Sequence, residues 1–223
     1  MKKLAVVLGV LALAVTAAQA ALIPPGSLTA TAEGEHEWYY GPEYAVNGAG
    51  LYMGTYPNEI HHGGHHSGHG NSTEQQWLSL EPTDWFKVDL GGLYSLDMIR
   101  VWNGSFRGTV VDDSLKDADI YYSSSPTDPG VPGGAGWTLW GAHEFVPNPG
   151  TGDWGKTEEI PMGGINAQWI GLDIKSNWGD YANWTAIGEL QFEGSPAQEQ
   201  VVVPEPATIA LFGLGMLALW RRR

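Results

Sequence analysis

The stretch Trp85-Phe86-Lys87-Val88-Asp89-Leu90-Gly91 decides the fold class of this chain. Phe86, Val88 and Leu90 alternate with Lys87 and Asp89, and this period of two is typical of a strand with one buried face. Glycine then ends the run. Comparable short alternating or apolar runs, each bounded by turn residues, predict further strands at residues 98–102, 118–123, 137–140, 169–174 and 187–192.

The rest of the central sequence agrees with an all-β domain. It contains no amphipathic helical stretch of three turns, and the chain has 31 glycines and 14 prolines, which interrupt long helices. Several short strands at this spacing favour a sandwich or jelly roll, formed as one domain by residues 21–194. We expect the tryptophans of the strand patterns to lie in its core, namely Trp85, Trp102 and Trp169.

Six pieces of sequence, taken in order, resemble discoidin (coagulation factor type C) domains. They are Ala45-Val46-Asn47-Gly48, Trp85-Phe86-Lys87-Val88-Asp89-Leu90-Gly91, Ile99-Arg100-Val101-Trp102-Asn103, Ala118-Asp119-Ile120-Tyr121-Tyr122-Ser123, Gln168-Trp169-Ile170-Gly171-Leu172 and Ile187-Gly188-Glu189-Leu190-Gln191-Phe192. The resemblance implies a galactose-binding-like jelly-roll sandwich. Asn47 stands where those domains have an aspartate, and the chain has no cysteine for the disulfide of that family.

The C-terminal tail has three parts in a fixed order. Pro204-Glu205-Pro206 is followed by an apolar run at 207–220 and then by Arg221, Arg222 and Arg223. The prolines disfavour helix before the run, and arginines favour the cytoplasmic side of a membrane. As a helix the run would measure about 21 Å, which is short for a hydrocarbon core of about 30 Å.

This tail resembles the PEP-CTERM sorting signal of Gram-negative bacteria, preceded here by a linker at 195–203. The resemblance implies that an exosortase, a membrane cysteine transpeptidase, removes residues 204–223 after transient anchoring in the inner membrane. It also implies a place at the cell surface or in an exopolysaccharide biofilm matrix. The alternative interpretation is an ordinary C-terminal membrane anchor.

The N-terminus predicts export. Lys2-Lys3, an apolar segment at 4–15 and Ala18-Gln19-Ala20 form a secretory signal peptide over residues 1–20, cut by signal peptidase. Apart from Lys2, Lys3 and the three terminal arginines, the chain holds 6 basic and 25 acidic side chains, a formal charge of −19. Such an acidic body repels phosphate backbones, so we do not expect a nucleic-acid partner.

No catalytic motif is present, and we predict that the protein is not an enzyme. Carboxylates are abundant, so a glycosidase pair such as Glu158 and Glu189 remains an arbitrary alternative. A histidine cluster is the most unusual local feature, consisting of His61, His62, His65, His66 and His69. Five imidazoles can hold a transition metal, whereas a solvated polar loop is the competing interpretation.

Aromatic residues outside the strand patterns are the candidate ligand contacts. A sugar ring stacks its apolar face on an aromatic ring, and polar side chains take the hydroxyls. We predict ligand-binding roles for Trp38, Asn103, Arg107, Trp178, Tyr181 and Trp184.

The discoidin resemblance also implies a structural Ca²⁺ site. Galactose-binding-like modules often hold calcium between the early loop and the glutamate of the last strand, here Asn47 and Glu189. The alternative is that Asn47 caps a turn and Glu189 is a solvated strand residue.

Three functions therefore remain open. The first is an exported, non-enzymatic sandwich that binds carbohydrate. The second is a structural matrix protein without a specific ligand, and the third is a surface protein that binds metal through the histidine cluster.

Overall fold

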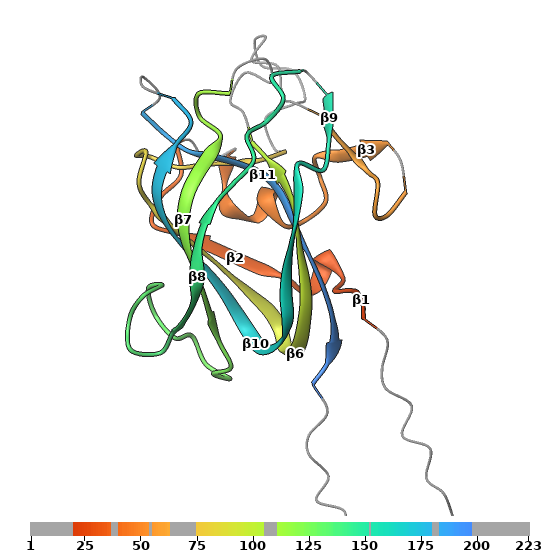
Figure 1. The fold of residues 1–223 in the computed structure, drawn as a ribbon, viewed down its shortest axis with the longest axis vertical. Coiled ribbons are helices and arrows are strands. Elements are labelled where there is room, and N and C mark those ends of the chain that lie inside the picture. The colour runs from red at the N-terminus through yellow and green to blue at the C-terminus, as the bar shows by residue number, and fades with distance from the viewer. Residues whose placement is uncertain are drawn as a thin grey trace, which may run out of the picture.

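A computed structural model describes residues 20–36, 40–53, 55–62, 75–104, 111–151, 153–179 and 183–197. They form a two-layered β-sandwich (Figure 1), which confirms the predicted fold class. No helix within these ranges is long and apolar enough to cross a membrane. The strands and the two short 3-10 helices are β1 Ala21–Leu22, η1 Pro25–Ser27, β2 Thr29–Ala32, η3 Pro42–Ala45, β3 Leu51–Met53, β4 Ile60–His62, β5 Trp77–Leu78, β6 Trp85–Asn103, β7 Leu115–Ser123, β8 Thr138–Glu144, β9 Asp153–Gly155, β10 Glu158–Asn177 and β11 Ala186–Pro196.

Two long strands, β6 and β10, belong to both layers. Residues 85–89 of β6 pair with 169–173 of β10 in the first layer, which continues to β2 on one side and to β7 and β8 on the other. Residues 94–101 of β6 pair with 158–167 of β10 in the second layer, beside β11, β1 and β5. Both strands turn between the layers at the lower end of the molecule in Figure 1.

The turn in β6 requires glycine. Gly91 has a φ of +76°, which side chains rarely adopt, and an added Cβ would lie 2.6 Å from the carbonyl oxygen of Ser27. Gly91, which ends the predicted strand 85–90, is therefore the corner at which β6 passes from the first layer into the second. The predicted strands 85–90 and 98–102 are two halves of β6.

The core lies between the layers and is built from the inward residues of each strand. Its largest fully buried side chains include Trp77, Phe86, Trp102, Phe145 and Phe192. The predicted core position of Trp102 is confirmed, and its Nε1 donates to the carbonyl of Glu59.

The core positions predicted for Trp85 and Trp169 are wrong. Both lie half-buried on the outer face of the first layer, because Phe86 and Ile170 take the inward positions. The Nζ of Lys87 lies 5.5 Å from the ring centroid of Trp85 and 5.6 Å from that of Trp169. It also lies 2.6 Å from the carboxylate of Asp128. The segment between β7 and β8 thus packs against this face through Lys87.

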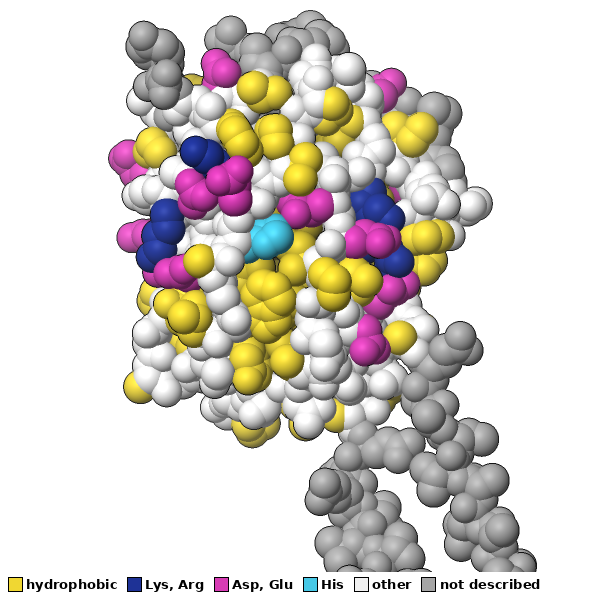
Figure 2. Space-filling model, in the orientation of Figure 1, with side chains coloured by type: hydrophobic (Ala, Val, Ile, Leu, Met, Phe, Trp, Pro, Cys, Tyr) yellow, Lys and Arg dark blue, Asp and Glu magenta, His cyan; other side chains and the backbone are white. Residues whose placement is uncertain are grey.

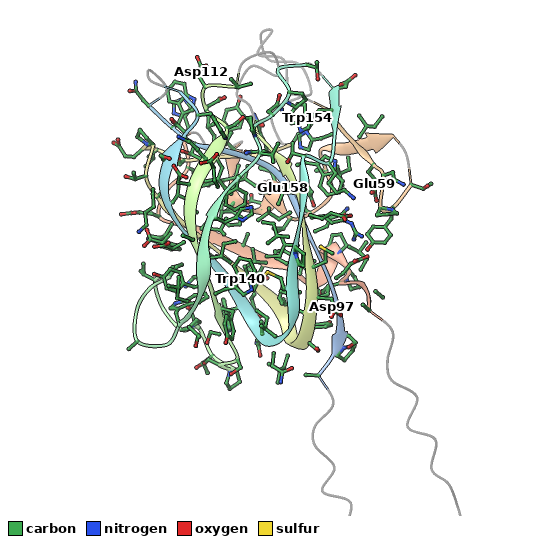
Figure 3. The ribbon with its side chains drawn as sticks, viewed as in Figure 1. Glu59, Asp97, Asp112, Trp140, Trp154 and Glu158 are labelled. Carbon is green, nitrogen blue, oxygen red and sulfur yellow. The ribbon has the colours of Figure 1, made fainter. Side chains whose placement is uncertain are left out.

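The sandwich is bridged on its open side by one carboxylate. Glu158, at the start of β10 and labelled in Figure 3, accepts from the backbone N–H of Val146 at 2.8 Å. Its other oxygen lies 2.8 Å from Nε2 of His143 in β8. Glu158 therefore links β8, the outermost strand of the first layer, to the start of β10, the outermost strand of the second. This residue, named above as one carboxylate of an arbitrary glycosidase pair, thus has a structural role.

Candidate functional site

At the upper end of the sandwich in Figure 1, β10 ends and β11 begins. Trp184 lies there just before β11, half-buried against Tyr40, Leu78 and Ala186. Its ring centroid is 4.6 Å from that of His36, with an interplanar angle of 34°. Residues 36 and 40 thus lie beside Trp184, although about 150 positions separate them in sequence. The ring of Trp184 is fixed in place and keeps part of its surface exposed.

Trp178 belongs to the same loop but has different neighbours. Its Nε1 donates to the carbonyl of Phe145 at 2.9 Å, and the Nζ of Lys116 lies 5.1 Å from its ring centroid. Asn177, directly before Trp178 in sequence, is buried, and its Nδ2 donates to the carbonyl of Trp184 at 2.8 Å. The loop is therefore anchored at both ends, with one half-buried ring on each side.

Asn103 is not a ligand contact, which corrects the prediction. It is fully buried at the end of β6. Its Nδ2 donates to the carbonyls of Leu115 and Val146 at 2.7 and 2.9 Å, and its Oδ1 accepts from the N–H of Leu115 at 2.9 Å. The amide is fully used in joining β6 to β7. The other predicted contacts, Trp38, Arg107 and Tyr181, lie outside the described residues.

The predicted calcium pair is brought together by the backbone. Glu189 is fully buried in β11, and its two carboxylate oxygens accept from the N–H of Gly48 at 3.0 and 3.2 Å. Burial raises the pKa of Glu189 well above its ordinary value, and repulsion from Glu59 adds to the rise. Asn47 lies next to this contact, but its Oδ1 accepts from the N–H of Ala49 at 2.8 Å and so caps the turn.

These residues fit a hard cation. Glu59 (Figure 3) has a buried carboxylate oxygen, Oε2, without a hydrogen-bond partner, and its charge acts on Glu189. Two carboxylates near each other in a buried place are costly as a charged pair, and a divalent ion would offset that cost. The described part of the chain has no group of three or more His, Asp or Glu side chains placed to hold a metal. A calcium site here would therefore need backbone carbonyls, which calcium accepts.

The first member of the histidine cluster is not in a solvated loop. His61 lies in β4, fully buried, with its ring stacked on Trp154 at a centroid distance of 4.7 Å. Its Nε2 lies 3.0 Å from the carbonyl of Gln75. A packed imidazole of this kind supports the small sheet of β3, β4 and β9. The side chains of His62, His65, His66 and His69 lie outside what the structure describes, so their metal binding stays a prediction.

Sequence reasoning missed His36 and Glu59. His36 stands two positions before the predicted contact Trp38, but His36 itself is not among the predicted contacts. Glu59 is one of 25 acidic residues and has no distinguishing sequence pattern. Its proximity to Glu189 depends on β3 and β4 folding beside the end of β6, which no local signal predicts.

A hollow of about 260 Å³ lies elsewhere, on the outer face of the first layer near β8. It is lined by Asp117, Ala118, Asp119, Ala142, His143, Glu144 and Lys175. Lys175 is held by Asp173 and lies 3.6 Å from Asp119, so the charges of the hollow are partly compensated. Of the predicted ligand contacts that the structure describes, none lines this hollow.

Comparison with known proteins identifies the tail. The profile of the PEP-CTERM protein-sorting motif matches residues 202–223. This chain carries a PEP-CTERM sorting motif. The match includes the predicted Pro204-Glu205-Pro206 and the three terminal arginines, and it confirms the interpretation of the tail as a sorting signal. A search of curated protein sequences gives no significant match.

Solved structures identify the fold of the sandwich. It is similar to CBM32-3 from a family 31 glycoside hydrolase of Clostridium perfringens, with a TM-score of 0.50 and 17% identity over 78% of this chain and 95% of that one. Another similar structure is the family 32 CBM of C. perfringens NanJ in complex with galactose (TM-score 0.47, 15% identity, 78% and 99% coverage). A third is an F5/8 type C domain from Bacteroides fragilis (TM-score 0.47, 13% identity, 79% and 97% coverage). The likeness to CBM32-3 confirms the predicted galactose-binding-like fold.

Proposed function

We propose that this protein is exported, cut by an exosortase at its PEP-CTERM tail, and displayed in the envelope or matrix as a non-catalytic carbohydrate-binding sandwich. The sorting motif marks an exported protein. The fold shared with CBM32-3, a module attached to a glycoside hydrolase, supports binding without catalysis. The final location and the processing step belong to the proposal.

The observation that carries carbohydrate binding is the ring of Trp184. It is partly exposed at the loop end and held against His36, so a sugar could stack on it without first ordering the side chain. The predicted contact Trp38 lies between residues 36 and 40, which both flank this ring. Trp178 supplies a second fixed ring on the other side of the loop, beside the cation of Lys116.

A glycan screen on residues 21–197 tests this function. We expect binding to at least one neutral or amino-substituted glycan, lost on Trp184→Ala. Trp169→Ala is the matched control, because it removes an equally half-buried indole from the outer face of the sandwich rather than from the loop end. Absence of binding across a broad array would favour a structural matrix protein instead.

The sorting step has its own test. Replacing Pro204 and Pro206 by alanine removes both backbone restrictions before the apolar run, so helix can extend upstream and hide the recognised peptide. We expect an unprocessed, membrane-held form to accumulate in cells that carry an exosortase. Maturation of the double variant at the normal rate and to the normal size would contradict processing at this motif.

We further propose that Glu189, with backbone oxygens of the loop that contains Asn47 and Gly48, holds a structural calcium ion. When bound, calcium would neutralise the buried charge of Glu189 and Glu59 and so stabilise the loop. The residues themselves already fix the loop, because Gly48 donates to Glu189.

A further inference from the structure

The chain leaves the sandwich for its sorting tail at a defined place. The last strand, β11, ends at Pro196, and the N–H of Ala197 donates to the carbonyl of Leu93 at 2.9 Å. Leu93 belongs to the corner of β6, and β1 pairs with β11 close by, at Gly194 and Glu193. In Figure 1 the corner of β6 and the end of β11 lie at the lower end of the molecule, away from the start of β11.

This end of the domain carries few charged residues. The segments 90–95, 129–139, 162–168 and 194–197 contain no Asp, Glu, Lys or Arg. Asp89 lies at the corner itself, where it accepts from the N–H of Gly91 at 2.9 Å, and Asp97 lies close to Gly164. The same chain has 25 acidic and 11 basic residues in total. In Figure 2 the charged side chains cover the middle and upper parts of the visible face, and its lowest part shows only hydrophobic and uncharged groups.

Apolar side chains project from this end of the domain. Among the exposed large hydrophobic residues of the described chain, Leu93 is 40% exposed, and Val131 and Leu139 are each 53% exposed. Val131 lies in the segment between β7 and β8, and Leu139 lies in β8 opposite Tyr121. Single exposed apolar residues are common on proteins. These three are distinguished by their place, on the half of the sandwich from which the tail departs.

The tail keeps this end near a membrane. Only residues 198–206 separate the sandwich from the apolar run, a span of at most about 30 Å when fully extended. A short tether of this kind gives an effective concentration in the millimolar range, at which weak contacts with the bilayer become populated. The more acidic remainder of the surface is repelled by anionic lipid headgroups, which favours approach through this sparsely charged end.

We propose that the end of the sandwich formed by Leu93, Val131 and Leu139 rests on the lipid bilayer while the tail is anchored. The proposal rests on the tail being held in the membrane, as in the proposed function. It follows that the loop end with Trp184 points away from the membrane and is accessible to glycans before the tail is cut.

The absence of cysteine allows a direct test on the chain with its tail intact. Leu93→Cys and Leu80→Cys are matched variants, because Leu80 is 53% exposed and lies at the loop end, where the neighbouring Ser79 N–H donates to the carbonyl of Thr185. Each is labelled with an environment-sensitive dye and reconstituted in phosphatidylcholine vesicles that carry a nitroxide-labelled lipid. We expect quenching at position 93 to exceed that at position 80 by at least threefold.

A second pair makes the result independent of one site. Val131→Cys and Val146→Cys exchange valines that are 53% and 47% exposed, and Val146 lies near the loop end, where its carbonyl accepts from Asn103. The same ratio is expected. Glutamate at Val131 and Leu139 should reduce quenching at position 93, and glutamate at Leu80 and Val146 should not.

The outcomes separate the two premises. If the chain floats with the vesicles but both members of each pair are quenched equally, the proposed orientation is overturned and the anchoring stands. If the chain does not float with vesicles at all, the anchoring is wrong and the orientation falls with it.

Discussion

The N–H of Gly48 donates to both carboxylate oxygens of Glu189, at 3.0 and 3.2 Å, across 141 positions of sequence. This contact joins the loop after η3 to the middle of the last strand. Burial of the carboxylate raises its pKa, and one N–H is a small compensation for a buried charge. A bound cation would compensate the buried charge of Glu189.

Calcium should raise the melting temperature of residues 21–197, because it would bind the native state alone. Glu189→Gln should abolish most of that rise, since the amide keeps an acceptor for Gly48 but loses the charge. The rise should also shrink as the pH falls, because the raised pKa of Glu189 makes protons compete with the metal. Differential scanning fluorimetry with millimolar calcium or with chelator measures both effects.

Glu193→Gln is the control for this prediction. Glu193 lies on the same strand but pairs with Arg100 at 2.7 Å, so its loss should lower the melting temperature without changing the calcium increment. A melting temperature that calcium leaves unchanged in the unmodified protein would rule out the site.

Asp84 should make the domain less stable as the pH rises. Burial raises its pKa from 3.8 to about 7. The folded state therefore holds a proton that the unfolded state has lost, and stability declines between about pH 4 and pH 7 and then levels off. Asp84→Asn keeps an acceptor for the N–H groups of Glu33 and Trp85 but removes the charge.

The Asp84→Asn variant should match the unmodified protein near pH 4 and exceed it above pH 7. One pKa unit corresponds to about 1.4 kcal/mol, so a gain of a few kcal/mol is expected there. Urea unfolding at pH 4 and pH 8 provides the comparison. An equal free-energy difference at both pH values would show that Asp84 does not hold its proton in the folded state.

Asn103→Ala should destabilise the domain by roughly 2–4 kcal/mol. The substitution leaves the buried N–H and C=O of Leu115 and the carbonyl of Val146 without the amide that they bond. Chemical denaturation of residues 21–197 measures the loss. A near-neutral result, combined with reduced glycan binding, would restore Asn103 as a ligand contact.

The sequence predicts the strands well because their alternation reflects burial. Phe86, Val88 and Leu90 alternate with Lys87 and Asp89 and all three are buried. A place in a strand pattern predicts a core position for Trp85 and Trp169, but the phase of the alternation decides which face a residue takes. Phe86 occupies the inward position next to Trp85, so Trp85 faces outward.

The loop end was predictable only in part. The sequence shows aromatic residues near positions 38 and 184. The contact between His36 and Trp184, however, depends on tertiary structure. Asn103 looks like a loop residue in sequence because it precedes glycine, whereas its amide is used to link two strands. Long-range hydrogen bonds of this kind have no local sequence signal.

The revised positions of the tryptophans give a stability prediction. Trp102→Ala should cost about 3–5 kcal/mol, as expected for a large core side chain whose Nε1 also bonds Glu59. Trp169→Ala should cost clearly less, because the ring is partly exposed on the outer face and its loss opens no enclosed cavity. Equal losses in urea unfolding would contradict the outer position of Trp169.

Titration of a glycan hit into Trp184→Ala and Trp169→Ala, by isothermal calorimetry, tests the central claim most directly. If the loop end binds carbohydrate by stacking, Trp184→Ala should weaken binding by about 1–3 kcal/mol, that is roughly five- to 150-fold. Trp169→Ala should retain the affinity of the unmodified domain, with both variants shown to be folded by their unfolding curves. Unchanged affinity for Trp184→Ala, or an equal loss for both variants, would contradict a carbohydrate site at this end of the sandwich.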